Sequence, residues 1–539
     1  MQVILNEENK RKVVDDASKD VGNKKQKSVN EQENEGMGED APLLDGVDVA
    51  QGYDEPGLAT VEEACVKFHE IKIRDPVDAM RWMIQPLDDA QFFDECFEVK
   101  PFFISRPNCR DMYRGLFGKE DIERLLYRDG GLLYSVDVDV TRFIDNRRKN
   151  YNYNGESAPK GEHVDGMQGQ SSERDYEVAD PKVVWQRYKN DGCSVRLLHP
   201  QRFVDSLWEV MFYLESYWNC CIGCNAYLTP AGTQGFAPHW DDIDAFVLQL
   251  EGQKRWKLYS SVDSTHVLPR YSSKDFDLSE LGDVTFDQVL QPGDLLYLPR
   301  GVIHEAQSLP DEDSLHITIS ANQRRNIYEF IQSLLPLATE AVSQVNIKMR
   351  RTLHPDFLTA CGSLGDPESP GLSQLEEIKE CVQLVTESLP VEMVADRWQQ
   401  EFMIERLPPP PSALNAEKAS ASGSAGCILH ETSKVKVACP YAFAILGDLE
   451  SVPPNLLICH CLSNPRSGHA ISSSSQLEST VPPQLELRLG CLETVQQLLA
   501  VRDDSIALSE IQDPQSESGI TTLQVAQGLL DAGLLVLVE

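Results

Sequence analysis

The sequence predicts an α+β protein in which a run of β-strands comes first and helices follow. Between residues 223 and 320, polar and apolar side chains alternate with a period of two, which is typical of half-buried strands. After Ser320 the apolar residues take helical spacing, as they do over 327–335 and again over 375–385. A chain of 539 residues exceeds one domain, so we expect several.

The first element along the chain is a polar tail over residues 1–58, rich in Glu, Asp, Asn, Lys and Gly and nearly free of aromatics. Such a composition cannot bury enough apolar surface to fold, so we expect a disordered tail that carries both acidic and basic groups. Lys10–Lys12 and Lys24–Lys27 form two basic clusters, which resemble a bipartite nuclear signal. Basic clusters are also common in solvated tails.

The strand region predicts several strands and turns. A strand begins at Gly223, and a loop rich in Gly and Pro leads from it to Pro238. The segments 244–251 and 254–259 are predicted as two strands joined by a tight turn at Glu251–Gln253. Residues 291–304 predict a turn, a buried strand and a second turn that ends at His304, and 315–320 alternates again.

Two histidines and one aspartate in this region have the pattern of a metal site. His239 and Asp241 are two residues apart, so on a strand they point to the same side while Trp240 points to the other. His304 follows 63 residues after the aspartate and must come from a neighbouring strand. Two imidazoles and one carboxylate are the ligands of non-haem Fe(II) oxygenases. Most His-x-Asp triplets are ordinary surface or core residues, so the spacing alone indicates iron only weakly.

Lys254 is anomalous because it shares the apolar face of its strand with Trp256 and Leu258. Burying an ammonium group without a partner is costly, so Lys254 needs an anion. In an iron oxygenase the natural anion is the distal carboxylate of 2-oxoglutarate. The alternatives are an internal ion pair and a lysine that extends to the rim of the barrel.

Polar side chains also lie along the interior faces of two strands. Asn225 and Tyr227 share one face of the first strand, which suggests a wet pocket. On the last strand His316, Thr318 and Ser320 share one side, and Thr318 and Ser320 could hydrogen-bond a carboxylate or serve only as small strand residues.

Residues 225–259 and 291–304 together resemble the JmjC ribosomal oxygenases. The run from Gly235 to Gly252 matches that family almost position by position, with Trp240 where Tyr is more usual. Residues 92–106 resemble an upstream segment of the same family, with Phe97 in place of Trp. The resemblance implies a double-stranded β-helix, the jelly-roll or cupin-like JmjC core, over residues 59–325.

The resemblance also implies the site. Fe(II) would be held by His239, Asp241 and His304, and 2-oxoglutarate would be anchored by Lys254. Asn225 and Ser320 would line the cosubstrate pocket, with O2 as the second cosubstrate. The resemblance also implies that Arg196 and Tyr227 are candidates for contacting a bound peptide.

Three function classes follow from this site. The family implies hydroxylation of a histidine in a large-subunit ribosomal protein, or demethylation of histone H3 lysines in transcriptional repression. The metal ligands are the same for both, so only the peptide pocket decides between them. A non-catalytic nuclear scaffold is the third class, and the presence of all three ligands and Lys254 argues against it. The family also implies a location in the nucleus, with nucleolus and nucleoplasm as its compartments.

The helical segments after the strands are expected to form a second region over 326–395. They could support the barrel, or form a homodimer as the family implies. A Pro-rich stretch at 408–411 then opens a Ser/Ala/Gly-rich linker that reaches about residue 426. Residues 396–539 resemble a winged-helix domain, with helices near 492–501 and 520–530, a closing strand at 534–538 and a loop insertion at 463–483.

Charge limits the partners of this chain. The segment 396–539 holds 17 Asp and Glu against 8 Lys and Arg, a net charge of −9, and phosphate binding requires excess positive charge. We therefore expect no direct nucleic-acid binding. The whole chain carries −36, which favours a basic partner such as a ribosomal protein or a histone tail.

The 14 cysteines are expected to be reduced thiols, because no secretory signal or 18-residue apolar run is present and no membrane contact is expected. The pairs Cys221–Cys224 and Cys459–Cys461 suggest zinc, but neither has a second pair at finger spacing. Buried structural thiols are the expected alternative.

Overall fold

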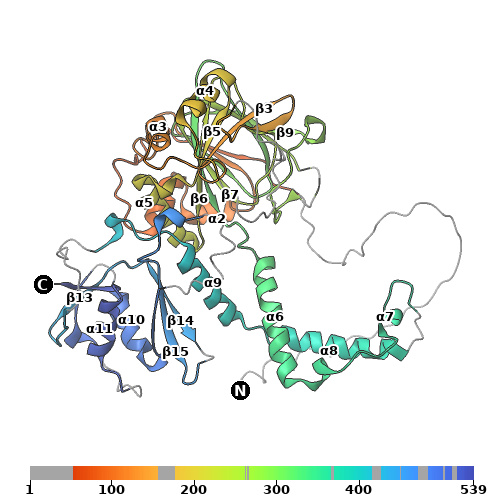
Figure 1. Ribbon diagram of the computed structural model, residues 1–539, viewed down its shortest axis with the longest axis vertical. Coiled ribbons are helices and arrows are strands. Elements are labelled where there is room, and N and C mark those ends of the chain that lie inside the picture. The colour runs from red at the N-terminus through yellow and green to blue at the C-terminus, as the bar shows by residue number, and fades with distance from the viewer. Residues whose placement is uncertain are drawn as a thin grey trace. The chain divides into compact units, whose positions relative to one another are not determined.

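The computed structural model describes residues 52–155, 176–261, 263, 266–365, 370–415, 427–448, 451–470, 483–501, 504–512 and 519–538. The predicted tail up to residue 51, with its two basic clusters, lies outside the described residues, as does most of the predicted linker and loop insertion. The predicted α+β content is confirmed, but the predicted order is not: helices also lie among the first strands, between Pro76 and Trp218, and further strands follow the helical region (Figure 1).

Two sheets build the N-terminal half. Nine strands form the larger sheet in the order β1-β2-β10-β7-β12-β6-β5-β3-β4, and the smaller sheet has the order β11-β8-β9. The strand bounds are β1 Gly57–Thr60, β2 Phe102–Ser105, β3 Val138–Ile144, β4 Arg147–Asn150, β5 Ser194–Leu198, β6 Gly223–Thr229, β7 Asp244–Glu251, β8 Lys254–Tyr259, β9 Val284–Leu290, β10 Leu295–Leu298, β11 Ile303–Ser308 and β12 Ser314–Ala321.

One apolar cluster joins the two sheets. Val247 of β7 and Leu296 of β10 belong to the larger sheet, whereas Trp256 and Leu258 belong to β8 of the smaller one, and all are buried in the same cluster. The strand period of two therefore places alternate residues of both sheets in a common interior. This interior is where the predicted site residues gather.

The tight turn predicted at Glu251–Gln253 is present, but it does not make a hairpin. β7 pairs with β10 and β12, while β8 pairs with β9 and β11, so the turn carries the chain from one sheet to the other. Gly252 has φ +60°, and a Cβ there would lie 1.8 Å from the carbonyl oxygen of Asp313. Only glycine fits this crossing.

Helices α1 to α5 accompany the larger sheet. Their bounds are α1 Pro76–Ile84, α2 Asp89–Glu95, α3 Lys119–Leu126, α4 Pro181–Asp191 and α5 Asp205–Trp218. Phe92 of α2 packs against Phe246 of β7 and Tyr297 of β10 with ring centroids 5.7 and 5.0 Å apart. The helices thus cover the face of the sheet that turns away from the site.

The helical region begins where the strand pattern ends. It consists of α6 Ile327–Val345, α7 Phe357–Ala360, α8 Ser373–Glu387 and α9 Val391–Glu405. The predicted boundary at 395/396 falls inside α9, whose Phe402 and Met403 pack with Ala444 and Leu446 of the strands that follow. The predicted tail also shortens, because β1 begins at Gly57 and pairs with β2.

The C-terminal region has two three-stranded sheets and two helices. The sheets have the orders β17-β13-β18 and β14-β15-β16. The bounds are β13 Lys434–Val437, β14 Phe443–Asp448, β15 Asn455–His460, β16 Gln484–Arg488, α10 Leu492–Ala500, β17 Ile506–Ala507, α11 Thr522–Asp531 and β18 Leu535–Val538. Of the helices described, none combines the length and apolar character needed to cross a membrane.

Candidate metal centre

His239, Asp241 and His304 come together in the interior between the two sheets. His239 Nε2 lies 3.8 Å from Asp241 Oδ1, and His304 Nε2 lies 3.8 Å from Asp241 Oδ2. One ligand atom from each residue lies within 4.8 Å of the other two. The backbones of His239 and His304 pair directly, with N to O distances of 3.2 and 2.9 Å, as expected for ligands on neighbouring strands.

The two imidazole rings are oriented by their own backbone. His239 Nδ1 lies 2.7 Å from the carbonyl oxygen of Ala237, and His304 Nδ1 lies 2.9 Å from that of Val302. A carbonyl oxygen only accepts, so each Nδ1 carries the proton and each Nε2 keeps its lone pair. This arrangement fixes both rings as metal ligands.

The protonation of the site suits a divalent cation. Burial, together with the smaller effect of the neighbouring His239, lowers the pKa of His304 to about 4. His304 is therefore neutral at physiological pH, as a metal-bound imidazole must be. The neutral His304 imidazole, the His239 imidazole and one carboxylate, with open positions beside them, fit Fe(II), the metal that the sequence predicts.

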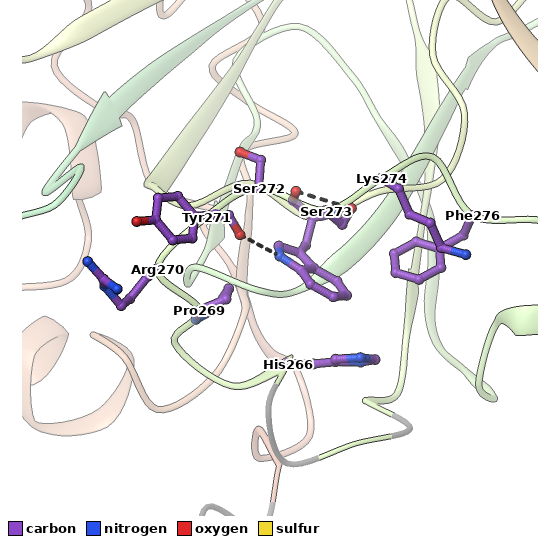
Figure 2. Close-up of a pocket in the computed structure, with 9 residues that line it drawn as sticks. His266, Pro269, Arg270, Tyr271, Ser272, Ser273, Lys274 and Phe276 are labelled. Atoms are coloured by element: carbon purple, nitrogen blue, oxygen red, sulfur yellow. Dashed lines mark hydrogen bonds between the residues drawn. The ribbon is translucent and has the colours of Figure 1, made fainter. Parts of the chain in front are cut away.

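A loop over residues 271–276 holds the ligand-bearing segment from the outside (Figure 2). The Ser273 hydroxyl accepts a hydrogen bond from the Trp240 backbone N–H at 2.9 Å, and the Trp240 indole donates to the carbonyl oxygen of Tyr271 at 3.0 Å. The Ser272 hydroxyl accepts from the Asp242 N–H at 3.2 Å. These contacts fix the backbone on both sides of Asp241.

Trp240 lies on the side opposite the metal ligands, as the strand period predicts. Its ring packs against His266 and Phe276, with centroids 4.4 and 5.1 Å apart, in a pocket that holds none of the three ligands (Figure 2). Ser272 and Ser273 were not identified from the sequence, because their partners are 30 and 33 residues away and no motif marks them.

Lys254 is buried, with 4% of its surface exposed, and its ammonium donates a hydrogen bond to Thr229 Oγ1 at 3.0 Å. Among the described residues no carboxylate forms an ion pair with it. The structure thus excludes both alternatives that the sequence left open: Lys254 does not extend to the rim of the barrel, and within the described part of the chain it makes no internal ion pair. Burial lowers the pKa of Lys254 to about 7.

Three buried polar atoms near Lys254 have no hydrogen-bond partner within the described structure: Asn225 Oδ1, Trp256 Nε1 and His316 Nδ1. The Trp256 ring lies next to both the metal ligand His304 and the buried His316, with ring centroids 5.8 and 5.4 Å away. Buried polar groups are normally satisfied, so this set of atoms fits a polar ligand that extends from Lys254 toward the metal ligands.

The remaining predicted residues lie on the same sheet. Tyr227 is stacked on His316 with ring centroids 4.7 Å apart, and Arg196 faces Tyr227 across the β5–β6 pair. Arg196 also forms an ion pair with Asp139, so its guanidinium is already engaged. Ser320 lies at the other end of β12 beside Gly223, and no described hydrogen bond joins it to Lys254.

The chain is similar to known proteins of one family. A family model described as the JmjC domain matches residues 196–329. A bifunctional lysine-specific demethylase and histidyl-hydroxylase of Dictyostelium discoideum is 31% identical over 461 residues, which cover 84% of this chain and 81% of that protein.

Two animal relatives match a shorter part of the chain. Ribosomal oxygenase 1 of Danio rerio is 36% identical over 344 residues, or 64% of this chain and 58% of that protein. Ribosomal oxygenase 1 of Homo sapiens is 35% identical over 330 residues, or 61% of this chain and 48% of that protein. The chain therefore spans about half the length of these two relatives.

Proposed function

Because this chain belongs to the JmjC ribosomal oxygenase family, we propose that it is an Fe(II)- and 2-oxoglutarate-dependent oxygenase that hydroxylates a histidine of a large-subunit ribosomal protein. The observation that carries the proposal is the pairing of His239, Asp241 and His304 with a buried, unpaired Lys254 within one interior. The substrate class follows from the names of the relatives, which include a histidyl-hydroxylase and ribosomal oxygenases.

Each residue of the interior has a distinct task in this proposal. His239, Asp241 and His304 hold Fe(II) through their free ligand atoms, and the Lys254 ammonium binds the distal carboxylate of 2-oxoglutarate. Asn225 supplies a polar contact to the same molecule, and Ser320 contributes from the end of β12. When bound, Fe(II) supplies the oxidation in which one atom of O2 enters a substrate C–H bond and the other converts 2-oxoglutarate to succinate and CO2.

The peptide lies on the open side of the triad in this proposal. Arg196 and Tyr227 are the residues that we propose contact it, which is supported by their place on β5 and β6 next to His316. Phe236 adds an aromatic surface between Tyr227 and His239, with ring centroids 5.6 and 6.2 Å away. Because Asp139 already pairs with Arg196, a basic peptide would meet a locally neutral site.

Demethylation of a histone H3 lysine is the second candidate, and the name of the Dictyostelium relative supports it. The same site would hydroxylate an N-methyl group, and the unstable product would release formaldehyde. Location in the nucleus and nucleolus remains a prediction that goes with either substrate, and a role in transcriptional repression is a prediction that goes with the demethylase.

The helical region provides a surface for the predicted homodimer. Ile327, Ile331 and Leu335 of α6 are 80, 42 and 37% exposed, and Val382 of α8 is 56% exposed. Clustered apolar side chains at this level of exposure are typical of an interface. We propose that a second copy of the chain covers them.

The C-terminal region is proposed to be a winged-helix-like domain that binds protein rather than nucleic acid. Its helices α10 and α11 contact each other and pack on the β17-β13-β18 sheet, an arrangement compatible with a helical pair and a wing. The net charge of −9 over residues 396–539 disfavours binding to phosphates.

Mass spectrometry of candidate peptides tests the function directly. A histidine-containing peptide from a large-subunit ribosomal protein should gain about 16 Da in the presence of Fe(II), 2-oxoglutarate and O2, with one succinate formed per turnover. Loss of about 14 Da from a methyl-lysine peptide, with formaldehyde release, would select the demethylase instead.

The matched control is His239→Ala, which removes one ligand from the triad. Turnover that survives in this variant would overturn the iron assignment. Absence of turnover in both wild type and variant, on peptides of either class, would support the scaffold hypothesis.

A further inference from the structure

A second cluster of metal-ligating side chains lies away from the proposed iron site. Glu215 comes from α5, Cys221 from the segment between α5 and β6, and His469 from the segment after β15. One ligand atom from each of these residues lies within 4.8 Å of the other two. The three residues connect the oxygenase region with the C-terminal region.

Cys221 belongs to one of the two cysteine pairs that suggested zinc in the sequence. Its sequence partner Cys224 does not join the cluster, because it lies inside β6 and is fully buried. Cys224 is thus a buried thiol, as the sequence analysis favoured over zinc binding by the C-x-x-C pair. The residues that join Cys221 are 6 positions before it and 248 positions after it.

Burial makes the charge of this cluster significant. Glu215 is 0% exposed and His469 is 2% exposed, and His469 Nε2 lies 2.6 Å from Glu215 Oε1. Glu215 also accepts hydrogen bonds from the backbone N–H groups of Ile222 and Leu407. The nearest guanidinium nitrogen is Arg406 Nε, 4.0 Å from Glu215 Oε2. The carboxylate is thus held in place by several groups, but its closest cation is outside hydrogen-bond distance.

Gln201 supplies an independent observation that points to a ligand. It is fully buried, its Nε2 lies 3.1 Å from His469 Nδ1, and its Oε1 has no hydrogen-bond partner among the described residues. Rotation of the Gln201 amide by 180° would let its Oε1 accept a hydrogen bond from a protonated His469 Nδ1. His469 Nε2 would then present a lone pair instead of a proton to the cluster.

A fourth candidate ligand lies near the thiol. Glu405, the last residue of α9, has Oε2 at 3.8 Å from Cys221 Sγ. Tetrahedral Zn(II) with bonds of about 2.0–2.3 Å places its ligand atoms about 3.3–3.8 Å apart. The 3.8 Å between Cys221 Sγ and Glu405 Oε2 lies in that range, whereas the 2.6 Å between His469 Nε2 and Glu215 Oε1 would have to widen and the Glu405 carboxylate would have to turn toward these two residues.

We propose that Glu215, Cys221 and His469, with Glu405 as fourth ligand, form a structural Zn(II) site that fastens the C-terminal region to the oxygenase region. When Zn(II) binds, the Cys221 thiol loses its proton to solvent. The His469 proton moves from Nε2 to Nδ1, and the Nδ1–H then donates a hydrogen bond to Gln201 Oε1. The charge of the ion is then offset by one thiolate and the two carboxylates. A soft thiolate in the ligand set favours zinc over the hard cations.

Cobalt titration tests the site with a readout that the iron site does not produce. A Co(II) thiolate bond gives a charge-transfer band in the near ultraviolet, whereas two histidines and an aspartate give none. The full chain carrying His239→Ala and His304→Ala should therefore still show this band, saturating at one Co(II) per chain, and Zn(II) should abolish it. The ion should also protect Cys221 from alkylation, measured by peptide mass spectrometry.

Cys221→Ser is the decisive variant, and Cys361→Ser, which removes an exposed thiol outside the cluster, is its control. The band should disappear in the first variant and persist in the second, with both variants retaining the wild-type circular dichroism spectrum. A band that persists in Cys221→Ser overturns the proposal. So does the absence of any band in the variant that lacks the iron ligands.

Discussion

At the scale of single residues, Lys254 combines three properties that rarely coexist. Its ammonium is buried, it has a hydroxyl as its hydrogen-bond partner, and no carboxylate pairs with it in the described part of the chain. Burying such an ammonium costs free energy, so we expect an anion that is not part of the chain to stabilise it. A dianionic cosubstrate with one carboxylate at this position would do so.

The pKa of about 7 for Lys254 makes binding of 2-oxoglutarate depend on pH. The carboxylate binds the ammonium form, which in the free protein is populated below pH 7 and lost above it. The affinity for 2-oxoglutarate should therefore be highest below pH 7. Above pH 7 it should fall by about tenfold per pH unit, until the pH reaches the higher pKa that Lys254 has in the complex.

Calorimetry in buffers of different ionisation enthalpy at pH 8 should detect uptake of about one proton per bound 2-oxoglutarate. Lys254→Arg provides the control, because guanidinium keeps its charge and removes this dependence. Binding at pH 8 without proton uptake by the wild type would contradict the assignment of Lys254.

Arg106 illustrates how much stability one buried residue can carry. It is fully buried, and its guanidinium donates to the carbonyl oxygens of Met83, Gln85 and Gly293 and to the Tyr113 hydroxyl. Arg106→Met would leave these acceptors unsatisfied, so we expect a loss of about 3 kcal/mol or more. Thermal denaturation would show a lower melting temperature.

Arg110→Met is the matched control for Arg106. The Arg110 guanidinium binds Asp294, but its side chain is 33% exposed and water can replace part of the contact. An equal fall in melting temperature for both variants would show that burial of Arg106 is not the source of the effect.

At the scale of elements, the loop over 271–276 supports the metal ligands although it contributes none. Ser273→Ala would remove the acceptor of the Trp240 N–H and loosen the backbone next to Asp241. Groups that orient metal ligands typically change metal affinity by 10 to 100-fold, so we expect a loss of about tenfold. Fluorescence or calorimetric titration with a divalent metal would measure it.

Ser273→Thr should restore the affinity because it returns the hydroxyl. Ser260→Ala is a matched negative control, since the Ser260 hydroxyl accepts the Asp283 N–H in the same way but holds no ligand segment. Equal losses in Ser260→Ala and Ser273→Ala would mean that the loop does not position the site.

The exposed face of α6 leads to a prediction about assembly. Ile331→Glu with Leu335→Glu would place two charges in the proposed interface between copies, so the chain should sediment as a monomer at concentrations where the wild type is a dimer. Val284→Glu, at a residue of β9 that is 52% exposed, should leave the dimer intact. A monomeric wild type would contradict the proposal.

At the scale of the whole molecule, a net charge of −36 is the dominant long-range property. Such a field attracts basic peptides and raises the rate of their encounter, and salt screens it. We expect kcat/KM for a basic peptide substrate to fall by about tenfold between low and high ionic strength. A substrate peptide with its flanking lysines and arginines replaced by glutamine should lose this dependence.

Steady-state kinetics at several salt concentrations would check the effect, with 2-oxoglutarate saturating so that only peptide capture is measured. If both peptides respond equally to salt, the charge of the chain does not steer the substrate.

Local patterns in the sequence were sufficient for strands β6, β7, β8 and β12, whereas the metal triad was predicted only together with the family resemblance. Alternation placed His239 and Asp241 on one side of their segment and Trp240 on the other, because the strand period depends only on backbone geometry. Helical spacing located α6 and α8 for the same reason. The turn at Gly252 was also predicted, since its residue types act locally.

Only the tertiary structure decided which partners these residues have. It separated β7 from β8 into different sheets, showed Lys254 without a carboxylate partner among the described residues, and placed Glu215 and His469 rather than Cys224 beside Cys221. Each of these facts depends on strand order or on contacts between residues far apart in sequence. The sequence by itself determined the local conformation and the ligand types, whereas the long-range packing decided which charges are paired.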